Sequence, residues 1–453
     1  MSHVAVIDIG KTNAKLALVN SVSLQEIIVI TQPNRVFDTK PWPHFDLSGI
    51  WTFIQNGLIR FQSQYSIDAI SITTHGASIV PIGKNGEAFP MLDYEYSGVN
   101  LMNNSYNQLR ADFSQTGSPR LPDGLNIGAQ LHWMLQTDQM IRNQLYRIVT
   151  YPQYWGYMLT GEYASDFTSL GCHSDLWNPY KSDFSSTLTA LDLQNYLAPV
   201  RCPDEILGEV KPALAKQLGL PAHLPVMVGI HDSNASLYPH LLSQNGSFSV
   251  VSSGTWTIAM AIGSSMVTLD PARDSLINVN ALGKPVPTAR FMGGREFDLI
   301  QNGRSYAPTN ADVVSVLRKN ILLMPAVETA TGPFQGHKKT WSVTTRSAGE
   351  ESVALSFYLA LMTRTCLNLI GASGPVIVEG PFANNQEYLR MLSALSPKGL
   401  LTSVSYTGTS IGAALLYSKK IKQSLASLRY SYEDEPELRA YGAAWRYAVD
   451  AIR

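Results

Sequence analysis

Apolar and polar residues alternate along the N-terminal part of the chain in a pattern typical of strands. Three short runs, at residues 4–9, 14–19 and 27–30, are apolar and rich in β-branched side chains. Residues 47–61 carry apolar side chains at spacings of three and four instead, which predicts a helix. A further apolar run at 67–73 predicts a buried strand. The order strand, strand, strand, helix, strand indicates an α/β fold.

The second half of the chain opens in a similar way. Residues 248–252 and 256–262 predict two strands joined by a short turn. The rest predicts a helix at 350–369, a strand at 375–379, a loop at 380–385, a helix at 386–395, a strand at 400–404 and a closing helix from about Ser410. Because a single core rarely grows beyond roughly 250–300 residues, a chain of 453 residues should form two domains. We place these domains at 1–243 and 244–453.

Composition narrows the class of protein. Hydrophobic residues make up 45% of the chain, enough for two cores, and the net charge is −1, so no basic surplus points to nucleic acid or to an anionic membrane. The three cysteines, Cys172, Cys202 and Cys366, are far apart, which argues against a disulfide framework or a structural zinc site. The N-terminus does not resemble a signal peptide, and no run of 18 apolar residues occurs. We therefore expect a soluble cytoplasmic protein with no membrane or nucleic-acid partner.

The first chemical motif is a turn that follows the first predicted strand. Asp8 ends that strand, and the turn offers N–H groups and polar side chains that could hold phosphate oxygens, with Mg²⁺ bound to Asp8 through water. The turn resembles the end of a Walker A loop, but that motif requires a glycine at position 5, where this chain has Ala5. The alternative is an ordinary hairpin turn. The turn consists of Gly10, Lys11, Thr12 and Asn13.

Two segments of the second half could likewise either bind a nucleotide or serve only as connections. Gly254 and Thr255 form a short turn between the two opening strands, which could contact phosphates or serve only as a turn. The loop at 380–385 joins a strand to a helix. A glycine there lets the backbone approach a ligand, and a helix N-terminus suits a nucleotide, but a plain connection fits equally well.

Asp232 is the strongest candidate for catalysis. It follows an apolar strand predicted at 226–230 and heads a helix that begins with small residues. A carboxylate in this position could accept a proton from a substrate hydroxyl, as a base does in phosphoryl transfer, or it could cap the helix.

Four motifs of this chain, in this order and spacing, resemble those of the FGGY carbohydrate kinases. The resemblance spans nearly the whole chain, and it looks closest to the rhamnulose kinase and fuculose kinase branch. A stretch at 157–166 also resembles that family's leucine-threonine-glycine-glutamate segment. The four motifs are Asp8-Ile9-Gly10-Lys11-Thr12-Asn13, Gly229-x-His231-Asp232-Ser233, Ser253-Gly254-Thr255-Trp256 and Glu379-Gly380-Pro381-Phe382-Ala383-Asn384.

The resemblance implies a fold, a reaction and a set of site residues. The fold is two ribonuclease-H-like domains, as in actin and hexokinase, with ATP and sugar in an interdomain cleft. The reaction is the ATP- and Mg²⁺-dependent phosphorylation of a ketose such as L-rhamnulose, L-fuculose or a ketopentose. Asp232 is implied as the base and Asp8 as the Mg²⁺-associated carboxylate. The other implied residues are Gly10, Lys11, Thr12, Asn13, Gly254, Thr255, Gly380 and Asn384 for the nucleotide, and His75, Gly76, His231 and Ser233 for the sugar.

The chain departs from the family pattern at three places. Lys11 stands where many members carry a small hydroxyl residue, and the adenosine loop is Gly-Pro-Phe-Ala rather than a run of glycines. The family's tryptophan followed by Asp-x-Arg is not found at 91–96, where the chain has Met-Leu-Asp-Tyr-Glu-Tyr. The identity of the sugar and the oligomeric state, a homodimer included, therefore stay open.

A second class of protein competes with the kinase. A non-catalytic actin-like nucleotide-binding protein, acting as a sugar-responsive regulator or a filament, would share the fold. Asp232 argues against this class, because a protein that only binds a nucleotide has no need of a base.

Overall fold

The computed structural model describes residues 2–304, 306–403, 408–419, 427–430 and 435–451. The chain divides into two compact units. The chain first passes from unit 1 to unit 2 after Ser243, and two later segments belong to unit 1 again. Unit 1 comprises Met1–Ser243, Ile277–Pro285 and Thr407–Ser424, and unit 2 comprises Gln244–Leu276, Val286–Tyr406 and Leu425–Arg453.

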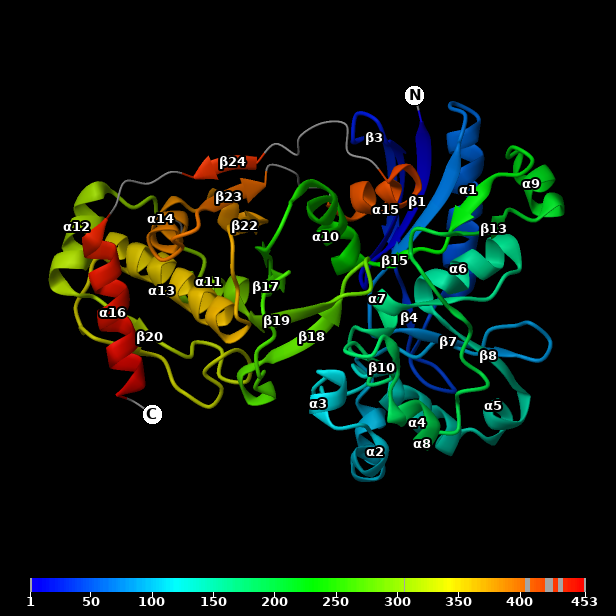
Figure 1. The fold of residues 1–453 in the computed structure, drawn as a ribbon, viewed down its shortest axis with the longest axis horizontal. Coiled ribbons are helices and arrows are strands. Elements are labelled where there is room, and N and C mark those ends of the chain that lie inside the picture. The colour runs from blue at the N-terminus through cyan, green and yellow to red at the C-terminus, as the bar shows by residue number, and fades with distance from the viewer. Residues whose placement is uncertain (1, 305, 404–407, 420–426, 431–434, 452–453) are drawn as a thin grey trace. The chain divides into compact units, whose positions relative to one another are not determined.

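A seven-stranded mixed sheet carries the candidate residues of unit 1 (Figure 1). Its strands are β1 (His3–Ile9), β2 (Asn13–Asn20), β3 (Gln25–Pro33), β6 (Ala69–Thr74), β13 (Ile206–Glu209), β14 (Pro225–Met227) and β15 (Ile230–His231). The order is β13-β14-β6-β1-β2-β3, and β15 also pairs with β6. β1 is antiparallel to β2 and parallel to β6, which is in turn parallel to β14 and β15.

Both faces of β1 are covered. Ala5 and Ile7 belong to the core that includes the buried side of α1 (Leu47–Gln62), the helix that the spacing at 47–61 predicts. Val4 and Val6 belong to the core on the other face, together with residues of α10 (Asp232–Ser243) and α15 (Gly408–Ser418). Alternate residues of a strand point to opposite faces, so a strand covered on both sides is apolar at nearly every position.

The helix expected to close the chain instead lies in unit 1. In Figure 1, α15, near the C-terminal end of the colour scale, lies beside the blue strand β1. A Cβ on Gly412 would overlap with the carbonyl oxygen of Ala235, so glycine allows α15 to pack directly on α10. Ser71 of β6 donates a hydrogen bond of 2.6 Å to the carbonyl of Ala413. The last helix of the chain is α16 (Pro436–Asp450).

The strand predicted at 226–230 is interrupted. Residues 228 and 229 separate β14 from β15, and Gly229 has a φ of 93°. A Cβ on Gly229 would lie 2.8 Å from the carbonyl oxygen of Ile72, so the bend needs a glycine for both its backbone angle and its close approach to β6. The bend lies just before His231 and Asp232.

Unit 1 contains further short strands and helices. They are β4 (Val36–Phe37), β5 (His44–Phe45), β7 (Ile79–Gly83), a 3-10 turn (Ser97–Met102), α2 (Asn103–Leu109), α3 (Phe113–Thr116), α4 (Ile127–Thr137), α5 (Gln139–Gln144), β8 (Leu145–Thr150), α6 (Tyr151–Thr160), β9 (Ser165–Asp166), α7 (Phe167–Leu170), β10 (Trp177–Asn178), β11 (Asp183–Phe184), α8 (Ser186–Ala190), β12 (Val200–Arg201) and α9 (Pro212–Leu218).

A second seven-stranded sheet has the order β18-β19-β17-β16-β22-β23-β24. Its strands are β16 (Phe248–Ser253), β17 (Thr257–Ile262), β18 (Ser275–Val279), β19 (Pro285–Phe291), β22 (Val376–Glu379), β23 (Leu400–Ser403) and β24 (Ser427–Tyr430). As in the first sheet, an antiparallel pair (β16 and β17) lies beside a parallel partner (β22). The strand predicted at 400–404 ends at Ser403, and residue 404 lies outside the described residues.

The long apolar helix α13 (Ala348–Leu369) belongs to the core of unit 2. By length and composition it is the one helix among the described residues that could cross a membrane. However, 78% of its most apolar window is buried inside the protein, which is typical of a core helix. Ser347 and Glu350 form a capping box that fixes its first turn.

The remaining elements of unit 2 surround this helix and the sheet. The loop predicted at 380–385 contains a short 3-10 turn, η3 (Pro381–Asn384), ahead of the predicted helix α14 (Gln386–Ala394). The others are a 3-10 turn (Pro271–Arg273), α11 (Gly293–Gln301), α12 (Asn310–Lys319), β20 (Leu323–Met324) and β21 (Thr340–Trp341).

Candidate active site

The sheet of unit 1 brings three candidate residues to one edge. The last residues of β1 and β15 both lie opposite Thr74, the last residue of β6. Parallel strands of one sheet end at the same edge, where ligands of α/β proteins commonly bind. Asp8, His75 and Asp232, which lie at or directly after these strand ends, are therefore neighbours although they are far apart in sequence.

Asp232 is partly accessible. It is the first residue of α10, and 31% of its side chain is exposed. Its Oδ1 accepts a hydrogen bond of 2.6 Å from the backbone N–H of Ser233 and lies 3.1 Å from Nε2 of His231. The Ser233 side chain is exposed, whereas His231 is buried. A ligand hydroxyl can therefore reach the carboxylate more easily than it can reach the imidazole.

Asp8 is held by groups from its own hairpin and from α15. Its Oδ2 lies 3.1 Å from Nζ of Lys15 and accepts hydrogen bonds from the hydroxyls of Thr409 (2.7 Å) and Ser410 (3.3 Å). Neither hydroxyl residue is among the site candidates predicted from the sequence, where Ser410 marks only the start of a helix. Nothing local marks them, because they lie some four hundred positions further along the chain.

The turn after β1 is closed by backbone hydrogen bonds and leaves polar side chains outside. Gly10 N–H donates to the carbonyl of Asn13 at 2.9 Å, and the Asn34 side chain donates to the carbonyl of Gly10 at 2.9 Å. Thr12 and Asn13 are exposed. Their hydroxyl and amide groups could therefore contact phosphate oxygens.

The structure places the ammonium group of Lys11 against acidic and aromatic side chains. Nζ forms an ion pair with Asp93 and lies 3.3 Å from Oε2 of Glu95. It also lies 4.9 Å from the ring centre of Phe45 and 4.8 Å from that of Tyr94. Residues 93–95 belong to the segment that matched no family pattern in the sequence. The alternation of acidic and aromatic residues there was the one local signal that could have marked them.

His75 is a buried, neutral imidazole surrounded by aromatic rings. The ring centres of Phe45, Tyr94 and Tyr151 lie 5.1–5.5 Å from its own. Burial lowers the pKa of His75 to about 4, so the ring is neutral at physiological pH. Nδ1 lies 3.1 Å from the hydroxyl of Ser78, whereas the buried Nε2 has no hydrogen-bond partner among the residues that the structure describes. An unsatisfied buried polar atom of this kind is a natural contact for a ligand hydroxyl.

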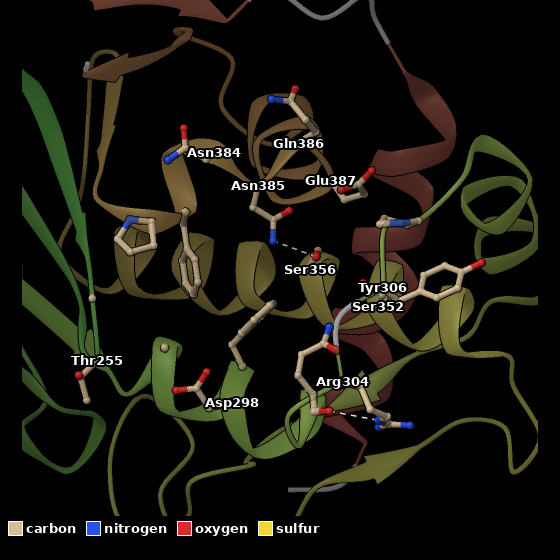
Figure 2. A pocket seen from close by; sticks show the side chains of 17 residues that line it. Thr255, Asp298, Arg304, Tyr306, Ser352, Ser356, Asn384, Asn385, Gln386 and Glu387 are labelled. Carbon is tan, nitrogen blue, oxygen red and sulfur yellow. Dashed lines mark hydrogen bonds between the residues drawn. The ribbon is translucent and has the colours of Figure 1, made fainter. Parts of the chain in front are cut away.

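Unit 2 contains a cavity of about 860 Å³ that is lined by three of the predicted nucleotide residues, Gly254, Thr255 and Asn384. In Figure 2, Asn384 and Asn385 face the cavity from η3 and the start of α14, and Thr255 and Asp298 lie across from them. The sequence analysis did not single out Asp298. A pocket of this size can hold a ligand as large as a nucleotide. The other lining residues are Gly294, Phe297, Gln301, Arg304, Tyr306, Pro308, Ser352, Ser356, Pro381, Phe382, Gln386 and Glu387.

Two glycines allow the turns around this cavity to approach one another. Gly380 has a φ of 78°, and a Cβ there would overlap with the carbonyl of Ser253. The Ser253 hydroxyl accepts a hydrogen bond of 3.0 Å from the N–H of Phe382, which ties the strand end to η3. On the other side, a Cβ on Gly294 would overlap with the carbonyl oxygen of Gly254. The shape of the cavity therefore depends on these two close contacts.

Glu296 lies on α11, the helix that also carries Gly294 and Asp298, but its side chain is buried. Oε1 accepts a hydrogen bond of 3.0 Å from the N–H of Glu328, and Oε2 accepts one of 3.0 Å from the hydroxyl of Tyr358. Burial raises the pKa of Glu296 to about 7, although these two hydrogen bonds oppose the rise.

Replacing Glu296 with Gln should stabilise the protein increasingly as the pH rises from about 4.5 to about 7. Across this window the folded protein retains a proton that the unfolded chain has lost, so the free energy of unfolding of the native protein falls and then levels off. The amide of Gln needs no proton. The difference in the free energy of unfolding should reach about 3 kcal/mol at pH 8, measured by urea unfolding over a pH series.

The matched control is Glu350→Gln. A hydrogen bond from Lys319, with others from Ser315 and the Ser347 backbone, lowers the pKa of Glu350 to about 2. Its contribution to stability is therefore present above pH 4.5 and lost as the pH falls towards 2, so this variant should be less stable than the native protein at neutral pH. A pH-independent difference for Glu296→Gln would show that Glu296 is ionised in the folded protein.

Two α/β units with polar turns at their strand ends fit a two-domain sugar kinase, and the comparisons with known proteins assign the class. The chain belongs to the FGGY family of carbohydrate kinases: the family's N-terminal domain matches residues 3–238, and its C-terminal domain matches residues 245–425. This result confirms the family predicted from the four motifs, and with it the α/β fold.

Individual relatives agree with this assignment. The chain is 25% identical to an L-fuculokinase from Escherichia coli (strain K12) over 268 residues, which cover 57% of this chain and only 56% of that protein. A crystal structure of a carbohydrate kinase from Novosphingobium aromaticivorans is 33% identical, with a TM-score of 0.91 over 98% of this chain and 100% of that one. A ligand-bound xylulose kinase from Lactobacillus acidophilus has a TM-score of 0.79 at 14% identity, over 100% of this chain and 98% of that one, which shows the shared fold alone.

Proposed function

We propose that this protein phosphorylates a hydroxyl group of a ketose, with ATP as the phosphoryl donor and Asp232 as the base. The observation that carries the proposal is the strand-end cluster of unit 1. It combines a partly exposed carboxylate on Asp232 with a neutral His75 whose Nε2 has no hydrogen-bond partner in the described part of the chain. Such a pair suits a polyhydroxylated ligand, because one group accepts a hydroxyl proton and the other hydrogen-bonds a neighbouring hydroxyl.

Each group of residues then has one role in the reaction. Asp232 accepts the proton of the sugar hydroxyl as that oxygen attacks, and His75, Gly76 and Ser233 surround the sugar. Thr12 and Asn13, whose side chains are exposed, contact phosphate oxygens in unit 1. In unit 2, the cavity bordered by Gly254, Thr255 and Asn384 binds the nucleotide, and Gly380 shapes the loop that leads to it. The bound nucleotide supplies the γ-phosphoryl group.

Magnesium fits this arrangement through Asp8. Mg²⁺ in kinases is commonly held by one or two carboxylates, substrate phosphates and water rather than by a cage of protein ligands. Consistent with that, no cluster of three or more potential metal ligands occurs in the part of the chain that the structure describes. Asp8 lies beside the exposed turn at Thr12 and Asn13, so its carboxylate would hold the ion through water.

Two further observations bear on the sugar. The L-fuculokinase relative is named for a ketose substrate, which supports a ketose such as L-fuculose, L-rhamnulose or a ketopentose. The carboxylates of Asp93 and Glu95, bridged by Lys11, add charged hydrogen-bonding groups beside the aromatic ring of Tyr94.

A panel of sugars tests the proposal. Purified protein, ATP and Mg²⁺ are incubated with L-fuculose, L-rhamnulose, L- and D-ribulose, D-xylulose, glycerol and gluconate, and ADP release is measured. We expect one ketose to raise ADP release well above the rate without sugar. ADP release that no ketose stimulates, from protein that still binds ATP, would contradict the proposal and favour a non-catalytic nucleotide-binding protein.

Lys11→Met should weaken sugar binding rather than nucleotide binding. Methionine keeps the length of the side chain but loses the ammonium group that pairs with Asp93 and Glu95. We expect the KM for the sugar to rise about tenfold, which corresponds to losing one charged hydrogen bond, and the KM for ATP to stay within twofold. Steady-state kinetics with each substrate varied in turn measures both values.

The control for Lys11→Met is Lys84→Met. Lys84 is exposed and donates to the carbonyl of Asn143, so this variant should leave both KM values unchanged. A rise in the KM for ATP with an unchanged KM for the sugar would place Lys11 with the phosphates, as the family resemblance implies.

A further inference from the structure

A cysteine that the proposed reaction does not use lies against the residue next to the proposed base. Cys172 is buried, and its sulfur lies beside the imidazole of His231. Nε2 of this ring lies 3.1 Å from Oδ1 of Asp232. A Cβ on Gly76 would come within 2.5 Å of the same Nε2 and 3.5 Å of the Cys172 sulfur, so the lack of a side chain at residue 76 is what lets these groups pack together.

Hydrogen bonds fix the segments that carry this cluster. The Thr168 hydroxyl donates to the buried carboxylate of Asp166 and accepts a hydrogen bond of 3.1 Å from the backbone N–H of His231. These bonds tie α7, whose end leads directly into Cys172, to β15. The side-chain amide nitrogen of Asn234 lies 3.4 Å from Nδ1 of His231, and Nε2 of the ring faces Asp232.

Negative groups around His231 favour its protonated form. Burial alone would lower the pKa of His231, but the thiolate of Cys172 and the carboxylates of Asp232 and Asp166 outweigh burial and raise it. His75 also faces this charge, and burial keeps His75 neutral.

The neighbouring histidines have the opposite effect on the pKa of the Cys172 thiol, which they lower. Burial alone would raise the pKa of Cys172, but the neighbouring His173 and His231 outweigh burial and lower it. The other two cysteines differ, because burial raises the pKa of Cys366 and, with Glu205 nearby, that of Cys202. Among the three cysteines, Cys172 is therefore the one whose surroundings favour the thiolate form.

We propose that Cys172 is a positioning residue for phosphoryl transfer. Its thiolate keeps His231 as an imidazolium, and the imidazolium holds the carboxylate of Asp232 in the orientation that meets the sugar hydroxyl. This inference rests on the proposed function, since it assigns Asp232 as the base. Cys172 acts through His231, which separates it from the base by one side chain. Without the thiolate, the buried imidazole loses its proton at a lower pH, and Asp232 loses its charged partner.

The first test measures the thiolate itself and needs neither sugar nor nucleotide. The Cys202→Ser/Cys366→Ser protein keeps Cys172 as its one cysteine, and ultraviolet absorbance of the thiolate is followed as the pH is raised. We expect the thiolate signal to be present at pH 7 and to disappear at this pH when His231→Gln is added. A signal that develops only above pH 8 would overturn the proposal, whether or not the protein phosphorylates a sugar.

The second test uses the pH dependence of kcat. Cys172→Ser should reduce kcat by about tenfold to a hundredfold, as expected when a reacting group is misplaced, and kcat should fall further as the pH rises through the neutral range. The native protein should keep its kcat over that range. Cys366→Ser, which replaces a buried cysteine of unit 2, is the matched control and should leave the pH profile unchanged.

A double-mutant cycle separates positioning from mere packing. If Cys172 acts through His231, the Cys172→Ser/His231→Gln protein should be no slower than His231→Gln alone. Additive losses, or a pH profile of Cys172→Ser that coincides with the native one, would overturn the inference. If Cys172→Ser fails to fold, the thiolate titration of the protein that retains Cys172 still decides the question.

Discussion

Asp232→Asn should reduce kcat by ~10²–10⁴-fold, the usual contribution of a general base. A sugar hydroxyl is a poor nucleophile at neutral pH, so its proton must leave as the bond to the phosphoryl group forms. Asparagine nearly preserves the shape of the side chain but cannot take the proton. Because the cavity at Gly254 and Thr255 lies in unit 2, the affinity for ATP should change by less than a few-fold. Steady-state kinetics with the sugar identified by the panel, together with ATP titration, measures both quantities.

Asp204→Asn is the matched control for this variant. Asp204 has the same exposed side-chain fraction, 31%, and also has a cationic partner, with its Oδ2 3.0 Å from Nζ of Lys419. It lies outside the proposed site, so its substitution should leave kcat unchanged. Near-native turnover in Asp232→Asn would show that this carboxylate serves the structure of the helix start rather than catalysis.

Gly294→Ala should raise the KM for ATP by about tenfold to a hundredfold. The added methyl group would overlap with the carbonyl oxygen of Gly254, which is a backbone atom and cannot swing aside as a side chain can. The turn at Gly254 and Thr255 must therefore move, and a displacement of about 1 Å in a binding group can cost about a hundredfold. Since His75 and Asp232 lie in unit 1, the KM for the sugar should stay within twofold.

Gly442→Ala provides the control for a glycine-to-alanine change in a helix of the same unit. Gly442 lies in α16, and an added Cβ there would meet only leucine side chains at 3.3 Å or more. We expect this variant to bind ATP as the native protein does. If Gly294→Ala also bound ATP normally, the turn at Gly254 would not be a nucleotide contact, and the proposed use of the cavity would have to be revised.

Local patterns in the sequence were enough to predict most of the elements that carry the site. β1, which contains Asp8, is apolar at nearly every position, and α1 shows its helical spacing directly, because burial selects side chains one element at a time. The turn at Gly10 and the helix start at Asp232 were visible for a related reason, since turns and helix ends require particular residues at particular positions. The family resemblance rested on these same segments.

Local patterns failed wherever the outcome depended on packing. The apolar run at 226–230 predicts one strand, but the close approach of Gly229 to Ile72 breaks it. The helix after residue 408 has no local feature that assigns it to unit 1. Its small residues at Gly412 and Ala413 fit against α10 and β6, and this fit decides the assignment.

The sequence by itself determined the α/β class and the family, and it marked the candidates Asp8, Asp232, Gly254 and Gly380. Each of these depends on residues close together in the chain. Only the tertiary structure decided how the candidates are surrounded: Lys11 paired with Asp93 and Glu95, Thr409 bonded to Asp8, His75 neutral among aromatic rings, and Cys172 against His231. The physical reason is that these contacts join segments separated by tens to hundreds of residues. Their charges and hydrogen bonds exist only after the sheet and the helices have packed, so no local pattern records them.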